Sequence, residues 1–191
     1  MKYKLTKNKK TIGDITLYQI EALKDFSNIK KGDLGGWIEK ESNLSHHGDC
    51  WVGGDAVVFG NARVFGSASV SGFAEVSGDA KVSGDASVYD DAVVCGSALV
   101  FGNAKVYGDT EVSGGARVYG NARVFDNAEV FGSASVYGFA RVFGFAKVFD
   151  NAKVYDNARV YDNARVSADV RVFGNARVFD NAKVYGDMII K

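Results

Sequence analysis

Residues 120–166 read GNARVFDNAEVFGSASVYGFARVFGFAKVFDNAKVYDNARVYDNARV, and Val recurs at every sixth position of this stretch. The period extends well beyond it. Val occupies every sixth position from Val52 to Val184, and Ile190 takes the next one, with no insertion or deletion. So regular a period is typical of repeat proteins, which stack one short unit many times. The 24 hexads therefore predict an all-β solenoid over residues 51–191.

Each hexad contains a very short strand. The residue two positions before each Val is Ala from Ala56 to Ala182, except at Thr110 and Val170. Successive side chains of a strand point to opposite faces, so Ala and Val point inward and the residue between them points outward. The other positions must turn the chain, and they are rich in Gly, Asn and Asp, which adopt positive φ most readily. We expect at least one such permissive residue at every corner.

Composition supports a continuous sheet. The chain has no proline, where average usage gives roughly ten, and proline removes a backbone donor from a sheet. Lys and Arg together number 23, as do Asp and Glu, so we do not expect direct binding to nucleic acid. No apolar run is long enough to span a membrane, and none follows the basic start MKYKLTKNKK. We therefore expect no membrane association and a cytoplasmic location.

The hexads, such as VFGNAR, resemble those of the hexapeptide-repeat proteins, the left-handed parallel β-helices. The resemblance covers residues 52–190 and departs after Val, where Phe or Tyr replaces that family's usual Gly. It implies three hexads per coil and a left-handed triangular prism of about eight coils. The stretch LGGWIEKESNLSHHGDCWV (residues 34–52) also resembles the head of uncharacterised bacterial and prophage hexapeptide-repeat proteins, which are often labelled acyltransferases on fold alone.

The two ends of the solenoid differ. Residues 1–50 lack the hexad and predict a small N-terminal cap, because a terminal coil otherwise exposes its core and unpaired backbone groups. At the other end the inward and outward positions become Met188, Ile189 and Ile190. These larger apolar side chains could close the core by themselves. We favour instead a homo-oligomer, most simply a two-fold dimer that uses this end or the adjacent aromatic edge.

Aromatic and basic residues dominate the predicted surface. Sixteen of the 22 Phe and Tyr residues directly follow a Val of the repeat. With coils of 18 residues, one outward column is basic at five successive positions, from residue 105 to residue 177. We predict a protein-binding surface from this column and three tyrosines, because large exposed patches mark interfaces. The set is Lys105, Arg123, Arg141, Arg159, Arg177, Tyr119, Tyr137 and Tyr155. Rings that shield the corners, with Arg stems lying over them, remain the alternative.

Catalytic residues are scarce. The only histidines are His46 and His47, which we interpret as polar turn residues beside Gly48 and Asp49. They could otherwise supply the general base that hexapeptide acyltransferases use, but the hexads contain no loop of the kind that helps to form such a site. The pair also lacks the second half of a zinc motif, so we expect no metal, and we expect no cofactor. Cys50 takes an inward position and should lie in the core.

These observations favour a non-catalytic rigid solenoid that acts as a structural or protein-binding module. A prophage-encoded inhibitor of a host protein is one concrete version. The alternative is a hexapeptide-repeat acyltransferase with an active site between subunits near the cap.

Overall fold

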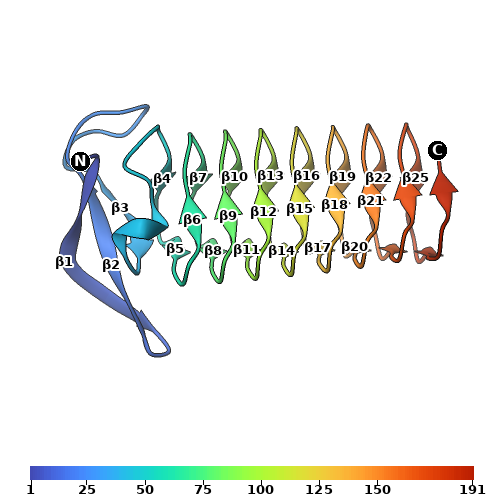
Figure 1. Cartoon of the computed structure of the whole chain (residues 1–191), viewed down its shortest axis with the longest axis horizontal. Helices are drawn as coiled ribbons and strands as arrows, with labels where there is room; N and C mark the ends of the chain where they lie inside the picture. Colours follow the sequence, from blue (N-terminus) through green and yellow to red (C-terminus); the bar gives the residue numbers. More distant parts are fainter.

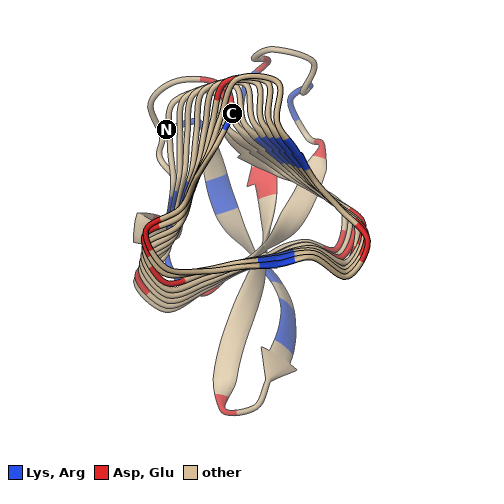
Figure 2. Cartoon of the chain, turned by 90° about the vertical axis from the view of Figure 1, so that its right-hand side faces the viewer, with Lys and Arg blue, Asp and Glu red and all other residues tan.

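The computed structural model describes all 191 residues and is an all-β rod with three long sheets (Figure 1). Each sheet forms one face of the rod, and we number them face 1, face 2 and face 3 in the order in which the chain passes through them. The chain returns to the same face after 18 residues, so that Val88, for example, lies beside Val106. The prediction of three hexads per coil is therefore confirmed, and Figure 2 shows the triangular cross-section.

The three faces are defined by their strands. Face 1 contains β1 (Tyr3–Ile12), β2 (Ile15–Ala22), β3 (Leu34–Ile38), β5 (Val57–Val58), β8 (Glu75–Val76), β11 (Val93–Val94), β14 (Glu111–Val112), β17 (Glu129–Val130), β20 (Lys147–Val148), β23 (Arg165–Val166) and β26 (Lys183–Val184). Face 2 contains β6 (Arg63–Val64), β9 (Lys81–Val82), β12 (Leu99–Val100), β15 (Arg117–Val118), β18 (Ser135–Val136), β21 (Lys153–Val154), β24 (Arg171–Val172) and β27 (Ile189–Ile190). Face 3 contains β4 (Trp51–Val52), β7 (Ser69–Val70), β10 (Ser87–Val88), β13 (Lys105–Val106), β16 (Arg123–Val124), β19 (Arg141–Val142), β22 (Arg159–Val160) and β25 (Arg177–Val178). The only helix is the 3₁₀ turn η1 (Glu41–Asn43).

The solenoid begins before the first regular hexad. Strand β3 pairs in parallel with β5, and Leu44 forms a parallel bridge with Val64. Face 1 consequently holds nine parallel strands, so the rod has about nine turns rather than the expected eight. The extra turn has no Val–x₅–Val signal, which is why the hexad count missed it.

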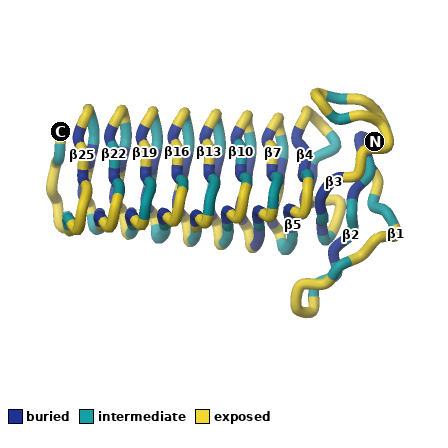
Figure 3. Tube along the Cα trace, turned by 180° about the vertical axis from the view of Figure 1, so that it is seen from behind, coloured by how far each residue is buried: buried dark blue, intermediate teal, exposed yellow.

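The core consists of the inward Ala and Val side chains, most of which are fully buried (Figure 3). Thr110, the one polar residue in the Ala series, is also buried, and its hydroxyl donates a hydrogen bond to the Tyr107 carbonyl at 2.7 Å. Cys50 is buried as predicted, whereas Cys95 is half-buried, and both are free thiols. The core continues without a break into the N-terminal region through Tyr3 and Ile20.

Positive φ occurs at the same position of nearly every corner. That position holds Gly or Asp, as at Gly144 (φ 69°) and Asp126 (φ 63°). The Asp126 carboxylate also accepts the Gly144 N–H, at the same corner of the next coil, at 3.2 Å. Ala168 (φ 59°) is the exception. This corner does contain a permissive residue, Asp169, but it lies one position after the residue that adopts positive φ.

The N-terminal region adds two antiparallel strands to face 1. Strands β1 and β2 form a long hairpin that projects beyond the triangular body (Figures 1 and 2). Its base is held by Lys2, which is 1% exposed and donates from Nζ to the Cys50 carbonyl at 2.6 Å. The Tyr3 hydroxyl donates to the Leu44 carbonyl at 2.8 Å. These bonds tie the start of the chain to the first turn.

Candidate protein-binding surface

The predicted basic column is a continuous feature of face 3. Strands β13, β16, β19, β22 and β25 pair in register, which places each basic residue directly beside the next. The column is Lys105, Arg123, Arg141, Arg159 and Arg177. All of these residues are exposed except Arg159, which is half-buried.

No carboxylate neutralises this column within the chain. The molecule has three ion pairs, Lys4–Glu21, Lys30–Asp25 and Lys147–Glu129, and none involves a column residue. Aspartates instead gather at the corners of the C-terminal coils, which face the viewer in Figure 2, while basic residues occupy the flat faces. Like charges on directly paired strands repel. A bound anionic surface would remove that repulsion.

The three predicted tyrosines lie on a different face from the column. Tyr119, Tyr137 and Tyr155 directly follow strands β15, β18 and β21 of face 2, and their ring centroids stack at 4.9 Å. The chain then turns a corner and enters face 3. The tyrosines thus form a separate ladder across an edge from the column, and the single combined surface that the sequence suggested is divided between two faces.

The column has its own ladder, which the sequence analysis did not single out. Each ring directly follows a strand of face 3, and the centroids of successive rings lie 4.8–5.4 Å apart. They are Tyr89, Tyr107, Phe125, Phe143, Tyr161 and Phe179. The 18-residue spacing already groups these residues, so the signal was present in the sequence.

Face 2 also contains a hollow of about 380 Å³ beside its tyrosines. Its lining includes Arg117 and Lys153 together with Tyr119 and Tyr137. Burial, and to a lesser extent the neighbouring Tyr119, raises the pKa of Tyr137. The Tyr137 hydroxyl therefore stays neutral at physiological pH. Arg117 and Lys153 are candidate binding residues that the sequence analysis missed.

The stacking restricts what these ladders can bind. Adjacent planes such as those of Tyr119 and Tyr137 differ by only 4°, and each interior ring has a neighbour on both sides. Nucleobases bind aromatic platforms through an exposed ring face. Here only the ring edges are free, which favours contact with protein side chains.

Two phenylalanines protrude at the corners that flank face 3. Phe139 and Phe145 are each 62% exposed, and they lie on either side of the strand that carries Arg141. Most equivalent corner positions in the second half of the chain hold Asn, Asp or Ser. Exposed aromatic residues close to Arg have the composition of interface hot spots.

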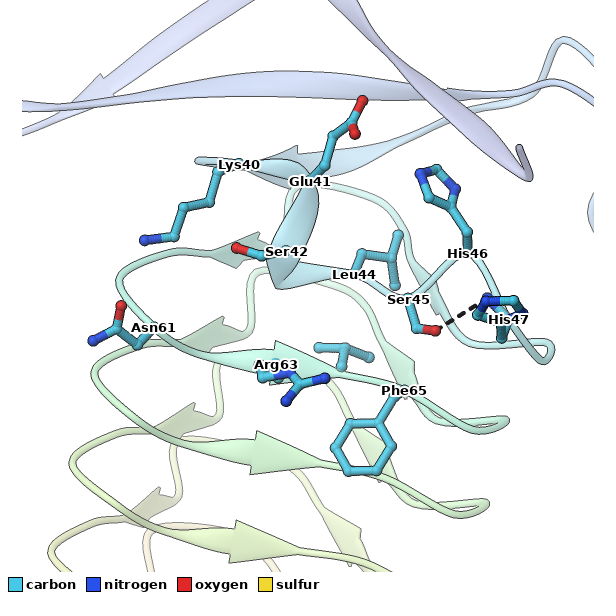
Figure 4. Close-up of a pocket in the computed structure, with 11 residues that line it drawn as sticks. Lys40, Glu41, Ser42, Leu44, Ser45, His46, His47, Asn61, Arg63 and Phe65 are labelled. Carbon is cyan, nitrogen blue, oxygen red and sulfur yellow. Dashed lines mark hydrogen bonds between the residues drawn. The ribbon is translucent and has the colours of Figure 1, made fainter.

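The histidines border a separate hollow of about 600 Å³ at the N-terminal end (Figure 4). The His46 ring stacks on Tyr3 at 4.3 Å, and its Nδ1 accepts the Lys2 backbone N–H at 3.3 Å. Burial lowers the pKa of His46. The His47 N–H donates to Ser45 Oγ at 3.0 Å, which orders the bend as Figure 4 shows. Arg63 lines the same hollow.

The predicted oligomer contact lies on the last turn. Ile189 is 67% exposed and Met188 is 47% exposed, while Ile190 is half-buried. Ile190 lines an apolar hollow of about 420 Å³ together with Phe179 and Val184. Strands β25, β26 and β27 are the outermost strands of the three faces at this end.

No cluster of three or more His, Cys, Asp and Glu side chains is arranged to hold a metal ion. The protein also has no helix with the length and apolar character needed to cross a bilayer.

Comparison with known proteins agrees with this architecture. Residues 56–72, 116–130, 152–168 and 158–172 match the family model described as the YdcK β-solenoid repeat. A segment of 39 residues is 41% identical to the protein named uncharacterized acetyltransferase YdcK of Escherichia coli (strain K12). The match covers 20% of this chain and only 12% of that relative. The hexad pattern, the three parallel sheets and the repeat match together show that the chain is a parallel β-solenoid whose repeats are similar to the YdcK β-solenoid repeat.

Proposed function

We propose that the protein is a non-catalytic rigid solenoid that binds a protein partner with an acidic surface. The observation that carries the proposal is the basic column of face 3, in which five cations lie side by side without an ion-pair partner. The prophage-encoded inhibitor of a host protein is a version of this proposal that rests on the sequence resemblance alone.

The shape of the charged surface favours protein over nucleic acid. Asp126 and Asp162 lie at the corner after face 3, and Asp156 lies at the corner before it. A sugar–phosphate backbone wider than the column would meet these carboxylates at both margins. An acidic ridge on a protein can meet the column alone, with Phe139 and Phe145 contacting apolar surface on either side of that ridge.

The test begins with affinity purification from the native cell and identification of the captured partner by mass spectrometry. Its affinity is then measured for a variant with Arg123, Arg141, Arg159 and Arg177 changed to Glu. We expect at least a hundredfold weaker binding, because the attraction between the basic column and the acidic surface of the partner becomes a repulsion. The matched control reverses four exposed lysines of the N-terminal region, Lys7, Lys9, Lys24 and Lys31. Equal affinity of the column variant and the unmutated protein would refute the role of the column.

A second candidate is acyl transfer, which is supported by the name of the YdcK relative and by the hollow beside the histidines. His46 is poorly suited as the base, because its Nδ1 already accepts the Lys2 N–H and the proton of the neutral ring therefore lies on Nε2. His47 is the better candidate to take a proton from an acceptor amine or hydroxyl. Calorimetric titration with coenzyme A, repeated with His47→Ala, distinguishes the two functions. Coenzyme A binding that depends on the hollow would favour the enzyme.

A further inference from the structure

The outward column of face 1 changes sign halfway along the rod. From the N-terminal side it carries carboxylates and apolar groups, and from β20 onward it is basic. In order, the paired positions are Val57, Glu75, Val93, Glu111, Glu129, Lys147, Arg165 and Lys183. The other two faces have no such reversal, because their columns hold no acidic residue.

An aromatic pair marks the point of reversal. Phe131 and Phe149 lie two residues beyond Glu129 and Lys147, so their side chains point out from the same face. The two rings stack at 4.9 Å. The equivalent positions one coil further out on each side are Ser113 and Ser167. The middle of face 1 therefore carries two stacked rings beside the Glu129–Lys147 ion pair, and it is bordered by hydroxyls and by charges of opposite sign.

We propose that two copies of the chain pack through face 1 as an antiparallel two-fold dimer, with the symmetry axis between β17 and β20. The symmetry axis lies in the contact plane and runs along the strands, at right angles to the rod. It reverses the order of the coils in the second copy, whereas the strands of the two copies stay parallel to one another. Outward residues of one copy then face outward residues of the other. Closed two-fold pairs of this kind are the commonest oligomers.

This arrangement pairs every charge near the axis with its opposite. Glu129 faces Lys147 of the second copy, and Glu111 faces its Arg165, each contact occurring twice by symmetry. The Lys147–Glu129 ion pair within one chain, at 2.6 Å, becomes half of a cluster of four alternating charges. Phe131 meets Phe149 of the second copy in a four-ring centre. A shift by one coil in either direction would bring two Glu129 or two Lys147 side chains together on the axis, so the charges also select the register.

The faces are flat enough for such packing. Ordinary sheets rotate by about 20–25° between neighbouring strands. Here the stacked rings of successive coils, including Phe131 and Phe149, differ by only 4°. Six strands of each copy, β11 to β26, would overlap over about 29 Å at strand spacing. The area buried in total is on the order of 1,000 Å², near the lower limit for a specific interface, so we expect a micromolar dissociation constant.

Faces 2 and 3 stay free in this dimer, so the inference does not depend on the proposed function. Each dimer would present two basic columns, and the two binding events of a bivalent partner would reinforce one another.

The test is the mass in solution, measured by light scattering during size-exclusion chromatography. The unmutated protein at about 100 μM should give twice the 20.5 kDa of one chain. Glu111→Lys with Glu129→Lys makes the column basic, and Lys147→Glu with Arg165→Glu makes it acidic. Each double variant should be monomeric alone, and an equimolar mixture should recover the dimer, because the two altered columns are complementary. Recovery on mixing also shows that both variants are folded.

Three results would overturn the proposal. One is a monomeric unmutated protein at this concentration. Another is a dimer that persists in both charge variants, and the third is a dimer that is lost instead in Ile189→Lys with Ile190→Lys, which would place the contact at the last turn. Arg123→Glu with Arg141→Glu serves as the control, since it reverses two charges on face 3 and should leave the dimer intact. A monomer would leave partner binding through face 3 open, because that affinity is measured separately.

Discussion

Replacement of Ala168 by Gly should stabilise the protein, because Ala168 is the only alanine with positive φ (59°). A left-handed conformation costs an ordinary L-residue about 1–2 kcal/mol. Glycine avoids that cost, but it loses about 0.5–1 kcal/mol through the greater freedom of its unfolded chain. The net expectation is a gain of about 0.5–1 kcal/mol in the free energy of unfolding. For a chain of this size that corresponds to a rise of about 1–4 °C in melting temperature.

The assay is thermal and urea denaturation followed by far-UV circular dichroism, with light scattering to exclude aggregation. Ala164→Gly provides the matched control, since Ala164 is fully buried and its φ is not positive. The same chemical change there should destabilise by about 1 kcal/mol, through lost packing and added chain entropy. If Ala168→Gly lowers the melting temperature, or if both variants shift it equally, the positive φ of Ala168 does not strain the folded protein.

Three further predictions concern the core and the N-terminal hollow. Val142→Asp should unfold or aggregate the protein, because Val142 is fully buried and a lone buried carboxylate costs several kcal/mol; a soluble variant of normal stability would contradict this. Burial lowers the pKa of His46, so the unfolded chain takes up a proton at higher pH than the folded protein does. The free energy of unfolding should therefore fall as the pH drops through about 6.5. His46→Gln should remove most of this dependence, as measured by denaturation midpoints at pH 7.5 and 5. Combined replacement of His46 and His47 by Ala should leave partner affinity unchanged while it lowers stability by about 1 kcal/mol, since the stack on Tyr3 is lost; weaker binding by the folded variant would implicate the hollow in function.

The repeat made most of the architecture predictable. The alternation of Ala and Val determines which side chains point inward, and the Gly, Asn and Asp positions determine where the chain turns. The step of 18 residues then follows once a triangular coil is assumed, and it correctly brings Arg123 beside Arg141. The stacking of Tyr119 on Tyr137 follows from the same step.

Other features depend on contacts that a periodic pattern does not encode. The extra turn depends on the pairing of β3 with β5, in a stretch whose spacing differs from the hexad. The burial of Lys2 depends on three acceptor groups of residues 48 and 50, far away in the sequence. The separation of the tyrosines from the basic column has a different cause. Each tyrosine lies on the face of the strand that it follows, and the chain turns a corner before it reaches the column.

The hydrogen bonds between coils run along the rod, as from the Arg123 N–H to the Ala140 carbonyl at 3.0 Å, and this has a mechanical consequence. A load applied to the two ends pulls directly against these bonds, and the coil at the end has neighbours on one side only. The protein should therefore yield to stretching by peeling one coil at a time. Each released coil of 18 residues adds roughly 60 Å of extended chain. The record of force against extension in an optical trap should be a regular sawtooth, whose teeth differ in height according to the corner and face contacts of each coil.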